Sequence, residues 1–198
     1  MQKVVFLDRD GTINQEVNYL HRCEDLKFLP GVPQALHELK AAGFKLAVIT
    51  NQAGVARGYY TCEDVETLHH FMNQQLEKEG AAIDAFYYCP HHPVHGIGIY
   101  KKACHCRKPE TGMFEMAEKE FEVDKSHSYM IGDKLIDVEA GVNYGVTGIL
   151  VGTGYGASER QNIEQKKEQP LYDFYAETLM DAARYIIRTE KGEDDGRE

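Results

Sequence analysis

A short apolar run near the amino terminus opens directly onto two carboxylates, and this feature constrains the fold more than any other. Residues 4–7 are all apolar, Asp8 and Asp10 follow them, and Gly11 allows a sharp turn. An apolar run of this length is typical of a buried strand. Alternate residues of an extended chain point the same way. The sequence therefore predicts a buried strand that delivers Asp8 and Asp10 together into a polar site.

Paired acids of this kind suit chemistry at phosphorus. A carboxylate attacks phosphorus when a cation shields its charge and a neighbouring acid protonates the departing oxygen. We expect Asp8 to attack, and Asp10 to protonate the leaving oxygen and later to activate water. Because an acidic pair after a strand also fits a plain polar turn, this interpretation depends on what else the chain contains.

Further polar groups follow along the chain. Thr50 ends a second apolar run, Lys108 stands just before an expected helix, and Asp133 ends a third run with Asp137 four residues on. Each could instead cap an element or carry a solvated charge. In an open parallel sheet, however, ligands gather at the carboxyl ends of the strands. We therefore expect one site, in which Thr50 and Lys108 bind the transferring phosphoryl group.

The acids of this site also predict a metal. Hard oxygen ligands favour magnesium, and the phosphate of a substrate can complete its coordination. The expected ligands are Asp8, the main-chain carbonyl of Asp10, and Asp133. Asp137 is expected to support these ligands from behind.

A second set of residues combines thiols with an imidazole. Its members are Cys89, His91, Cys104 and Cys106. Three thiolates and one imidazole form a closed, soft ligand set that suits structural zinc, although isolated buried cysteines are the alternative. Other histidines compete for the fourth position, namely His92, His95 and His105. Zinc here would order the loop over residues 89–109, and its ligands immediately precede the basic pair Arg107 and Lys108.

Composition limits the classes of function. The chain has 198 residues, of which 42% are hydrophobic, enough for one good core. Its formal net charge of -10 argues against a nucleic-acid partner, since phosphate polymers are attracted by basic surfaces. No apolar run is long enough to span a membrane, and the amino terminus does not look like a secretion signal. We expect a cytoplasmic monomer with reduced thiols.

The remaining pattern predicts a single α/β domain over residues 1–188. Helices are expected over residues 31–42 and from Thr61 to Gly80, and strands over residues 85–89 and 148–151. Alternation of strands and helices favours a Rossmann-like parallel sheet with helices on both faces. Residues 189–198 contain no apolar side chain and are expected to form a disordered tail.

In this order, the motifs resemble a known family. Asp8-x-Asp10-Gly11-Thr12, Thr50-Asn51, Lys108 and Gly132-Asp133 look like the four motifs of the haloacid dehalogenase superfamily of phosphatases, over residues 4–151. The resemblance implies that fold, an aspartyl-phosphate intermediate and bound magnesium. The segments TNQAGVARG at 50–58, CPHHP at 89–93 and CHCRKP at 104–109 are similar, more closely, to the heptose bisphosphate phosphatases of this superfamily. That similarity implies removal of a 7-phosphate and a zinc loop in place of a separate cap domain.

Specificity is expected to come from loops around the acids. Arg107 could grip the distal phosphate of a sugar bisphosphate, although surface ion pairs are the alternative for Arg107 and Arg57. The residues expected to bind the substrate are Glu16, Val17, Asn18, Tyr19, Asn51, Gln52, Ala53, Arg57, Arg107 and Lys134. Other functions remain open, namely a histidinol-phosphate phosphatase, a polynucleotide 3′-phosphatase and a zinc-containing interaction module without catalytic activity.

Overall fold

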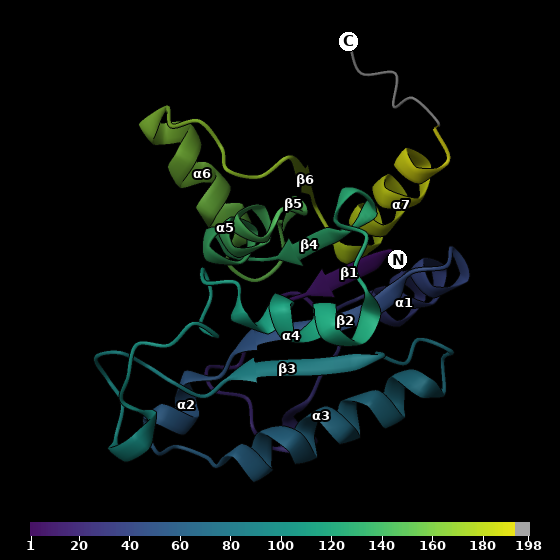
Figure 1. Ribbon diagram of the computed structural model, residues 1–198. Coiled ribbons are helices and arrows are strands. Elements are labelled where there is room, and N and C mark those ends of the chain that lie inside the picture. Colours follow the sequence, from purple (N-terminus) through teal and green to yellow (C-terminus); the bar gives the residue numbers. More distant parts are fainter. Residues whose placement is uncertain (193–198) are drawn as a thin grey trace.

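A parallel sheet forms the centre of the computed structural model, which describes residues 1–192 (Figure 1). The strand order is β3-β2-β1-β4-β5-β6, and all neighbouring pairs are parallel. The strands are β1 (Val4–Leu7), β2 (Lys45–Asn51), β3 (Ala85–Cys89), β4 (Tyr129–Gly132), β5 (Thr147–Val151) and β6 (Phe174–Ala176). Because all strands run in one direction, their carboxyl ends meet at one edge of the sheet.

Helices cover both faces of this sheet. One face packs against α1, α7 and the end of α3, and the other packs against α4 and α5. The helices are α1 (Val32–Ala41), α2 (Ala53–Ala56), α3 (Cys62–Glu77), α4 (Gly112–Phe121), α5 (Leu135–Tyr144), α6 (Gly156–Lys166) and α7 (Leu179–Glu190), with short 3-10 helices η1 (Cys23–Asp25), η2 (Gly98–Tyr100) and η3 (Lys125–His127). The predicted α/β class and Rossmann-like sheet are confirmed.

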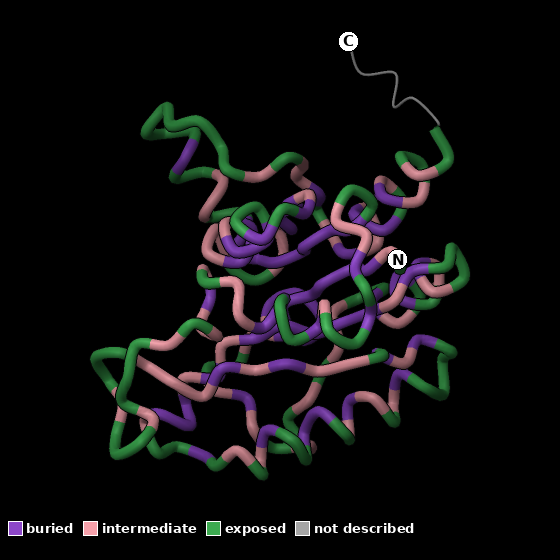
Figure 2. The backbone as a smooth tube through the Cα atoms, in the orientation of Figure 1, coloured by how far each residue is buried: buried purple, intermediate pink, exposed green. Residues whose placement is uncertain are grey.

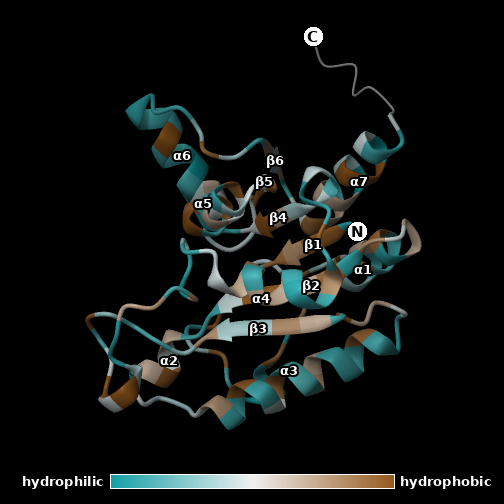
Figure 3. Ribbon diagram, viewed as in Figure 1, coloured by the Kyte–Doolittle hydropathy of each residue, from teal (hydrophilic) through white to brown (hydrophobic). Residues whose placement is uncertain are grey.

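The first strand shows why both layers are needed. Val5 and Leu7 pack with α1 and α7, whereas Val4 and Phe6 pack with α4. Successive side chains of a strand point to opposite faces, so a wholly apolar strand is stable only when both faces are covered. The central strands are accordingly buried (purple in Figure 2) and carry hydrophobic residues (brown in Figure 3).

The predicted helix after Thr61 forms, with a different end. The Thr61 hydroxyl accepts a hydrogen bond from the Asp64 amide at 3.1 Å, and the Asp64 carboxylate accepts one from the Thr61 amide at 2.7 Å. This reciprocal pair is a capping box and fixes the start of α3. The helix ends at Glu77, before the expected Gly80, because Gly80 has a φ of 65° and its amide turns back to the Glu77 carbonyl.

The carboxyl-terminal part of the fold departs further from expectation. Neither α6 nor β6 was predicted. The helix α6 buries only Gly156 and Ile163 and therefore lacks an apolar stripe, and the strand β6 has only three residues. The predicted tail begins inside a helix, because α7 continues to Glu190. Glu190 accepts hydrogen bonds from Lys3 at 2.6 Å and from the Tyr129 hydroxyl at 2.8 Å, which hold it against the sheet. Residues 191 and 192 form a turn after the helix, and residues 193–198 of the predicted tail lie outside the described residues.

The loop expected to carry zinc lies beside the carboxyl edge of the sheet. Residues 90–111 connect β3 to α4 and contain only the short helix η2, with no inserted domain. Within residues 1–192, no helix is both long enough and apolar enough to cross a lipid bilayer.

Candidate active site and metal centres

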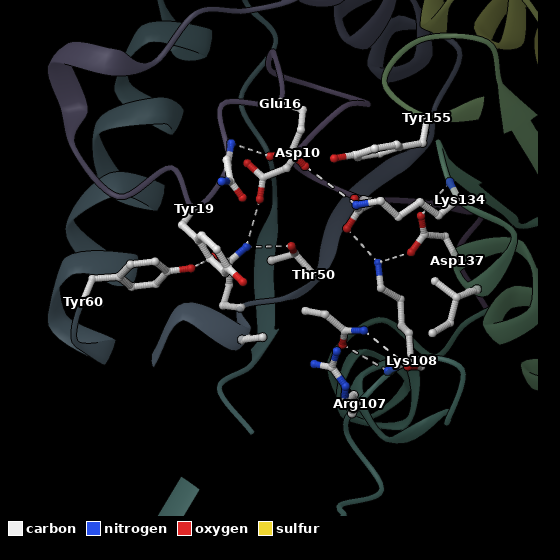
Figure 4. Close-up of a pocket in the computed structure, with 16 residues that line it drawn as sticks. Asp10, Glu16, Tyr19, Thr50, Tyr60, Arg107, Lys108, Lys134, Asp137 and Tyr155 are labelled. Atoms are coloured by element: carbon white, nitrogen blue, oxygen red, sulfur yellow. Dashed lines mark hydrogen bonds and ion pairs between the residues drawn. The ribbon is translucent and has the colours of Figure 1, made fainter. Parts of the chain in front are cut away.

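A cavity of about 400 Å³ opens at the carboxyl edge of the sheet (Figure 4). Most of the predicted site residues line it: Asp8, Asp10, Glu16, Asn18, Tyr19, Thr50, Asn51, Gln52, Ala53, Arg107, Lys108 and Lys134. Four further residues also line the cavity: Tyr60, Ile136, Asp137 and Tyr155. The cavity is therefore built from segments that are far apart in the sequence.

Two residues expected to bind substrate lie elsewhere. Val17 is 43% exposed and lines a neighbouring surface hollow, because its neighbours Glu16 and Asn18 face the cavity and turn Val17 away. Arg57 follows α2 and does not line the cavity, and its Nε is buried without a hydrogen-bond partner. Neither residue lines this cavity, so their contact with a substrate stays a prediction.

Lys108 lies at the floor of the cavity and joins two acids. Its ammonium group is 2.7 Å from Asp8 Oδ1 and 2.7 Å from Asp137 Oδ1, and it donates to the Ile49 carbonyl at 2.8 Å. Burial alone would lower the pKa of Lys108, but the charges of Asp137 and Asp8 raise it above its ordinary value. Lys108 is therefore a cation, and it lies beside the carboxylate that is expected to attack.

The carboxylates of Asp8, Asp133 and Asp137 form a cluster whose ligand oxygens all lie within 4.8 Å of one another. Burial and the negative charges of Asp8 and Asp137 raise the pKa of Asp133 to about 8. Its Oδ1 is buried and has no hydrogen-bond partner. Only Lys108 forms an ion pair with these three acids among the described residues, and the clustered carboxylates with their unpartnered oxygen fit a divalent cation.

Asp137 differs from the other two acids in having both oxygens occupied. Its Oδ1 contacts Lys108, and its Oδ2 accepts a hydrogen bond from the Lys134 amide at 3.1 Å. Burial raises the pKa of Asp137 to about 6, although Lys108 opposes the rise. The carboxylate therefore supports Lys108 and the start of α5 from behind the cluster.

The loop between β5 and α6 holds Asp133 in place. The Tyr155 amide donates to Asp133 Oδ2 at 2.9 Å, and the Thr153 hydroxyl donates to the Gly11 carbonyl at 2.7 Å. A side chain at Gly11 or Gly154 would collide with the Asp133 carboxylate, and both glycines have positive φ. Sequence reasoning missed this loop, although the run Gly152-Thr153-Gly154-Tyr155-Gly156 after an apolar strand was a signal for it.

The side chain of Asp10 is held by several donors. Arg9 contacts both of its oxygens, at 2.9 and 3.1 Å from the same nitrogen, Asn14 donates to Oδ1 at 3.0 Å, and Gln52 donates to Oδ2 at 3.2 Å. Burial alone would raise the pKa of Asp10, but Arg9 and these hydrogen bonds lower it below its ordinary value. Gln52 also donates to the Thr50 hydroxyl at 2.9 Å, so it links Asp10 to Thr50, two of the four predicted catalytic residues.

The second cluster contains the predicted thiols and imidazole. The Sγ atom of Cys106 lies 3.2 Å from Cys89 Sγ, 3.3 Å from Cys104 Sγ and 3.4 Å from His91 Nδ1. The donor set is therefore gathered around one point, as a tetrahedral zinc ion requires. Arg107 donates from Nη1 to the His91 carbonyl at 3.1 Å, so the cluster adjoins a residue of the cavity.

The competing histidines have other contacts. His92 Nδ1 accepts from the amides of Val94 and His95 at 3.2 and 2.9 Å. His105 lies 2.8 Å from Glu115 and 3.5 Å from Glu110. Among the described histidines, His91 alone joins the thiols in the cluster.

Known proteins resemble this chain in sequence. One matching family model is described as HAD-hydrolase-like, over residues 105–182, and another as polynucleotide kinase 3 phosphatase, over residues 3–142. The D-glycero-beta-D-manno-heptose-1,7-bisphosphate 7-phosphatase of Haemophilus ducreyi is 45% identical, over 93% of this chain and 98% of its own length. The D-glycero-D-manno-heptose-1,7-bisphosphate 7-phosphatase of Thermosynechococcus vestitus is 43% identical, over 92% and 94%.

A solved structure agrees with these relatives. The D,D-heptose 1,7-bisphosphate phosphatase from B. bronchiseptica, crystallised with magnesium and phosphate, is 31% identical and has a TM-score of 0.81. The similarity covers 95% of this chain and 99% of that chain. The similarity therefore extends over nearly the whole fold.

Proposed function

This chain belongs to the D-glycero-D-manno-heptose-1,7-bisphosphate 7-phosphatases within the haloacid dehalogenase-like hydrolases, and on that premise we propose that it removes the 7-phosphate of this sugar bisphosphate and keeps the 1-phosphate. The observation that carries the proposal is the 45% identity to the Haemophilus ducreyi phosphatase over nearly the whole of both chains. The cavity, with an acid pair and a buried lysine at its floor, supports the same activity.

The arrangement supports a reaction in two steps. A carboxylate oxygen of Asp8 attacks the phosphorus, the bond from phosphorus to the sugar oxygen breaks, and Asp10 gives that oxygen a proton. Asp10 then takes a proton from water, the water oxygen attacks the aspartyl phosphate, and inorganic phosphate leaves Asp8. Lys108 and Thr50 stabilise the charge on the phosphoryl oxygens in both steps.

Asp8, Asp133 and the Asp10 carbonyl would hold magnesium, and Asp137 would keep Lys108 in position beside them. When bound, magnesium supplies positive charge for the phosphoryl oxygens. The unpartnered Asp133 Oδ1 and the excess of carboxylates support this assignment. These side chains come from the ends of β1 and β4 and the start of α5, so the sheet itself sets their spacing.

Cys89, His91, Cys104 and Cys106 would hold zinc, and the role of that zinc would be structural. The cluster closes the loop that contains Arg107, which donates to the His91 carbonyl and lines the cavity. Zinc in this position orders the side of the cavity where the distal phosphate binds. Glu16, Asn18 and Tyr19 form the other side of the cavity.

Magnesium-dependent phosphate release tests the proposal. We would compare kcat/KM for both anomers of D-glycero-D-manno-heptose 1,7-bisphosphate with the values for histidinol phosphate and a 3′-phosphorylated oligonucleotide. A clear preference for either heptose anomer is the expected result. A preference for histidinol phosphate or for the oligonucleotide would contradict the proposed substrate, and the absence of any magnesium-dependent release would contradict the catalytic role.

A further inference from the structure

Arg9 is a fully buried arginine that connects residues of the cavity lining to a residue outside it. Its side chain is 0% exposed, although it lies between the two acids of the amino-terminal motif. Besides Asp10, its guanidinium donates to the Leu20 carbonyl at 3.1 Å and to Gln52 Oε1 at 3.2 Å. On the side remote from Asp10, its Nη1 lies 3.2 Å from Nε2 of His69. A buried guanidinium is stable only when its donors find acceptors.

His69 completes this set of acceptors from α3. Arginine has no acceptor and stays protonated in proteins, so Arg9 must donate to an unprotonated His69 Nε2. Burial and the positive charge of Arg9 lower the pKa of His69 to about 3, in agreement with a neutral ring. The ring is 4% exposed and stacks on Phe86 with centroids 4.8 Å apart. His69 is absent from the lining of the cavity.

We propose that Arg9 and His69 form a buried brace that orients the Asp10 carboxylate for proton transfer. His69 is then a positioning residue, which acts through Arg9 without contacting the substrate. The inference rests on the proposed function, in which Asp10 protonates the leaving oxygen. The brace consists of three contacts that meet at Arg9. Arg9 donates to His69 on one side, and to Asp10 and Gln52 on the other.

Losing the imidazole acceptor has a directional consequence. An Arg9 donor left buried without an acceptor favours rotation of the guanidinium toward another acceptor. Because the same guanidinium contacts both oxygens of Asp10, that rotation changes the direction of the carboxylate. The phosphoryl-binding residue Lys108 forms its hydrogen bonds and ion pairs with Asp8, Asp137 and the Ile49 carbonyl, and not with Arg9 or His69. Proton donation should therefore weaken while phosphoryl binding by Lys108 is kept.

Leaving-group dependence provides a test that a merely structural role would not pass. We would measure kcat/KM for p-nitrophenyl phosphate, whose leaving group needs little protonation, and for phenyl phosphate, whose leaving group needs more. In His69→Leu we expect kcat/KM for phenyl phosphate to fall about tenfold and that for p-nitrophenyl phosphate to fall less than about twofold, since general acid catalysis contributes on the order of 10²-fold or more. His70→Leu, the same change at the exposed neighbouring residue, is the matched control.

A rescue variant separates the acceptor from the ring. The amide oxygen of His69→Gln can accept from Arg9, so phenyl phosphate turnover should return to within about threefold of wild type. Should His69→Leu not fold, His69→Asn replaces it, because its amide is one methylene shorter and does not reach Arg9. An equal loss for both phosphates, the absence of any loss, or the absence of recovery in His69→Gln would overturn the proposal. These substrates do not contain heptose, so the result is distinguishable from failure of the heptose assignment.

Discussion

The two clusters of metal-binding side chains are positioned in different ways. Asp8 and Asp133 stand at the ends of neighbouring central strands, and all three acids of their cluster are buried. In the thiol cluster only Cys89 is buried, at the end of the edge strand β3, and its other members lie in the loop that follows. That loop exposes its own large apolar side chains, Val94, Ile97 and Ile99.

The difference indicates which cluster depends on its metal. Strands packed on both faces hold the acids together whether or not a cation is bound. The loop has little apolar burial to compensate for the entropy of ordering it, so a metal must supply that free energy. We therefore expect the carboxylate cluster to determine reactivity, and the thiol cluster to determine whether one side of the cavity exists.

Removing the nucleophile should produce the largest effect and leave the other cluster intact. Asp8→Asn should lower kcat at least about a thousandfold, since an amide cannot form the covalent intermediate. Zinc content, measured by elemental analysis, should stay at the wild-type level. Asp25→Asn changes an exposed aspartate outside the acid cluster and serves as the control. Appreciable residual turnover, or loss of zinc with activity, would contradict the separation of the clusters.

Breaking the thiol cluster should produce a smaller loss by a different route. Cys106→Ser should release zinc and lower kcat/KM by about 10- to 100-fold, because disorder of the loop displaces Arg107. Magnesium binding, measured by calorimetry, should persist. Cys23→Ser, at a half-buried cysteine outside the cluster, is the matched control. A Cys106→Ser variant that keeps both zinc and normal kinetics would exclude a structural zinc role.

Crowding Asp133 should weaken magnesium binding alone. In Gly154→Ala the new side chain would meet the Asp133 carboxylate, and we expect magnesium affinity to fall about tenfold with zinc content unchanged. Gly98→Ala is the control for backbone strain, since Gly98 has a φ of 51°, close to the 54° of Gly154, and has nothing within 4 Å of the added atom. Similar magnesium affinities in the two variants would show that the glycine at position 154 does not matter for Asp133.

The stability of the fold should depend on pH through His69, a residue outside both clusters. His69 has an ordinary pKa of 6.5 and a pKa of about 3 in the folded chain, so below pH 6.5 the unfolded chain takes up a proton that the folded chain does not. Stability is therefore lost as pH falls, by up to about 2 kcal/mol between pH 6.5 and 5. Urea unfolding of His69→Gln should lack this component, whereas His70→Gln should keep it. Equal slopes for wild type and His69→Gln would contradict a neutral buried ring.

Much of the site could be predicted because it depends on strand ends. Apolar runs before Asp8, Thr50 and Asp133 are local signals for buried strands, and parallel strands bring those positions to one edge. The thiol cluster was also predictable, because ligand spacing and ligand chemistry are properties of a short segment. The family resemblance that these motifs carried is confirmed by the relatives at 45% and 43% identity.

The sequence by itself determined the fold class, the acids and thiols, and the edge at which they meet. Tertiary structure alone decided that Val17 turns away from the cavity, that Tyr155 closes over Asp133, and that His69 reaches Arg9 across 60 positions of the chain. The physical reason is that a local pattern governs backbone conformation and the burial of nearby side chains. Contacts between distant residues depend instead on how complete elements pack, and no short pattern contains that information.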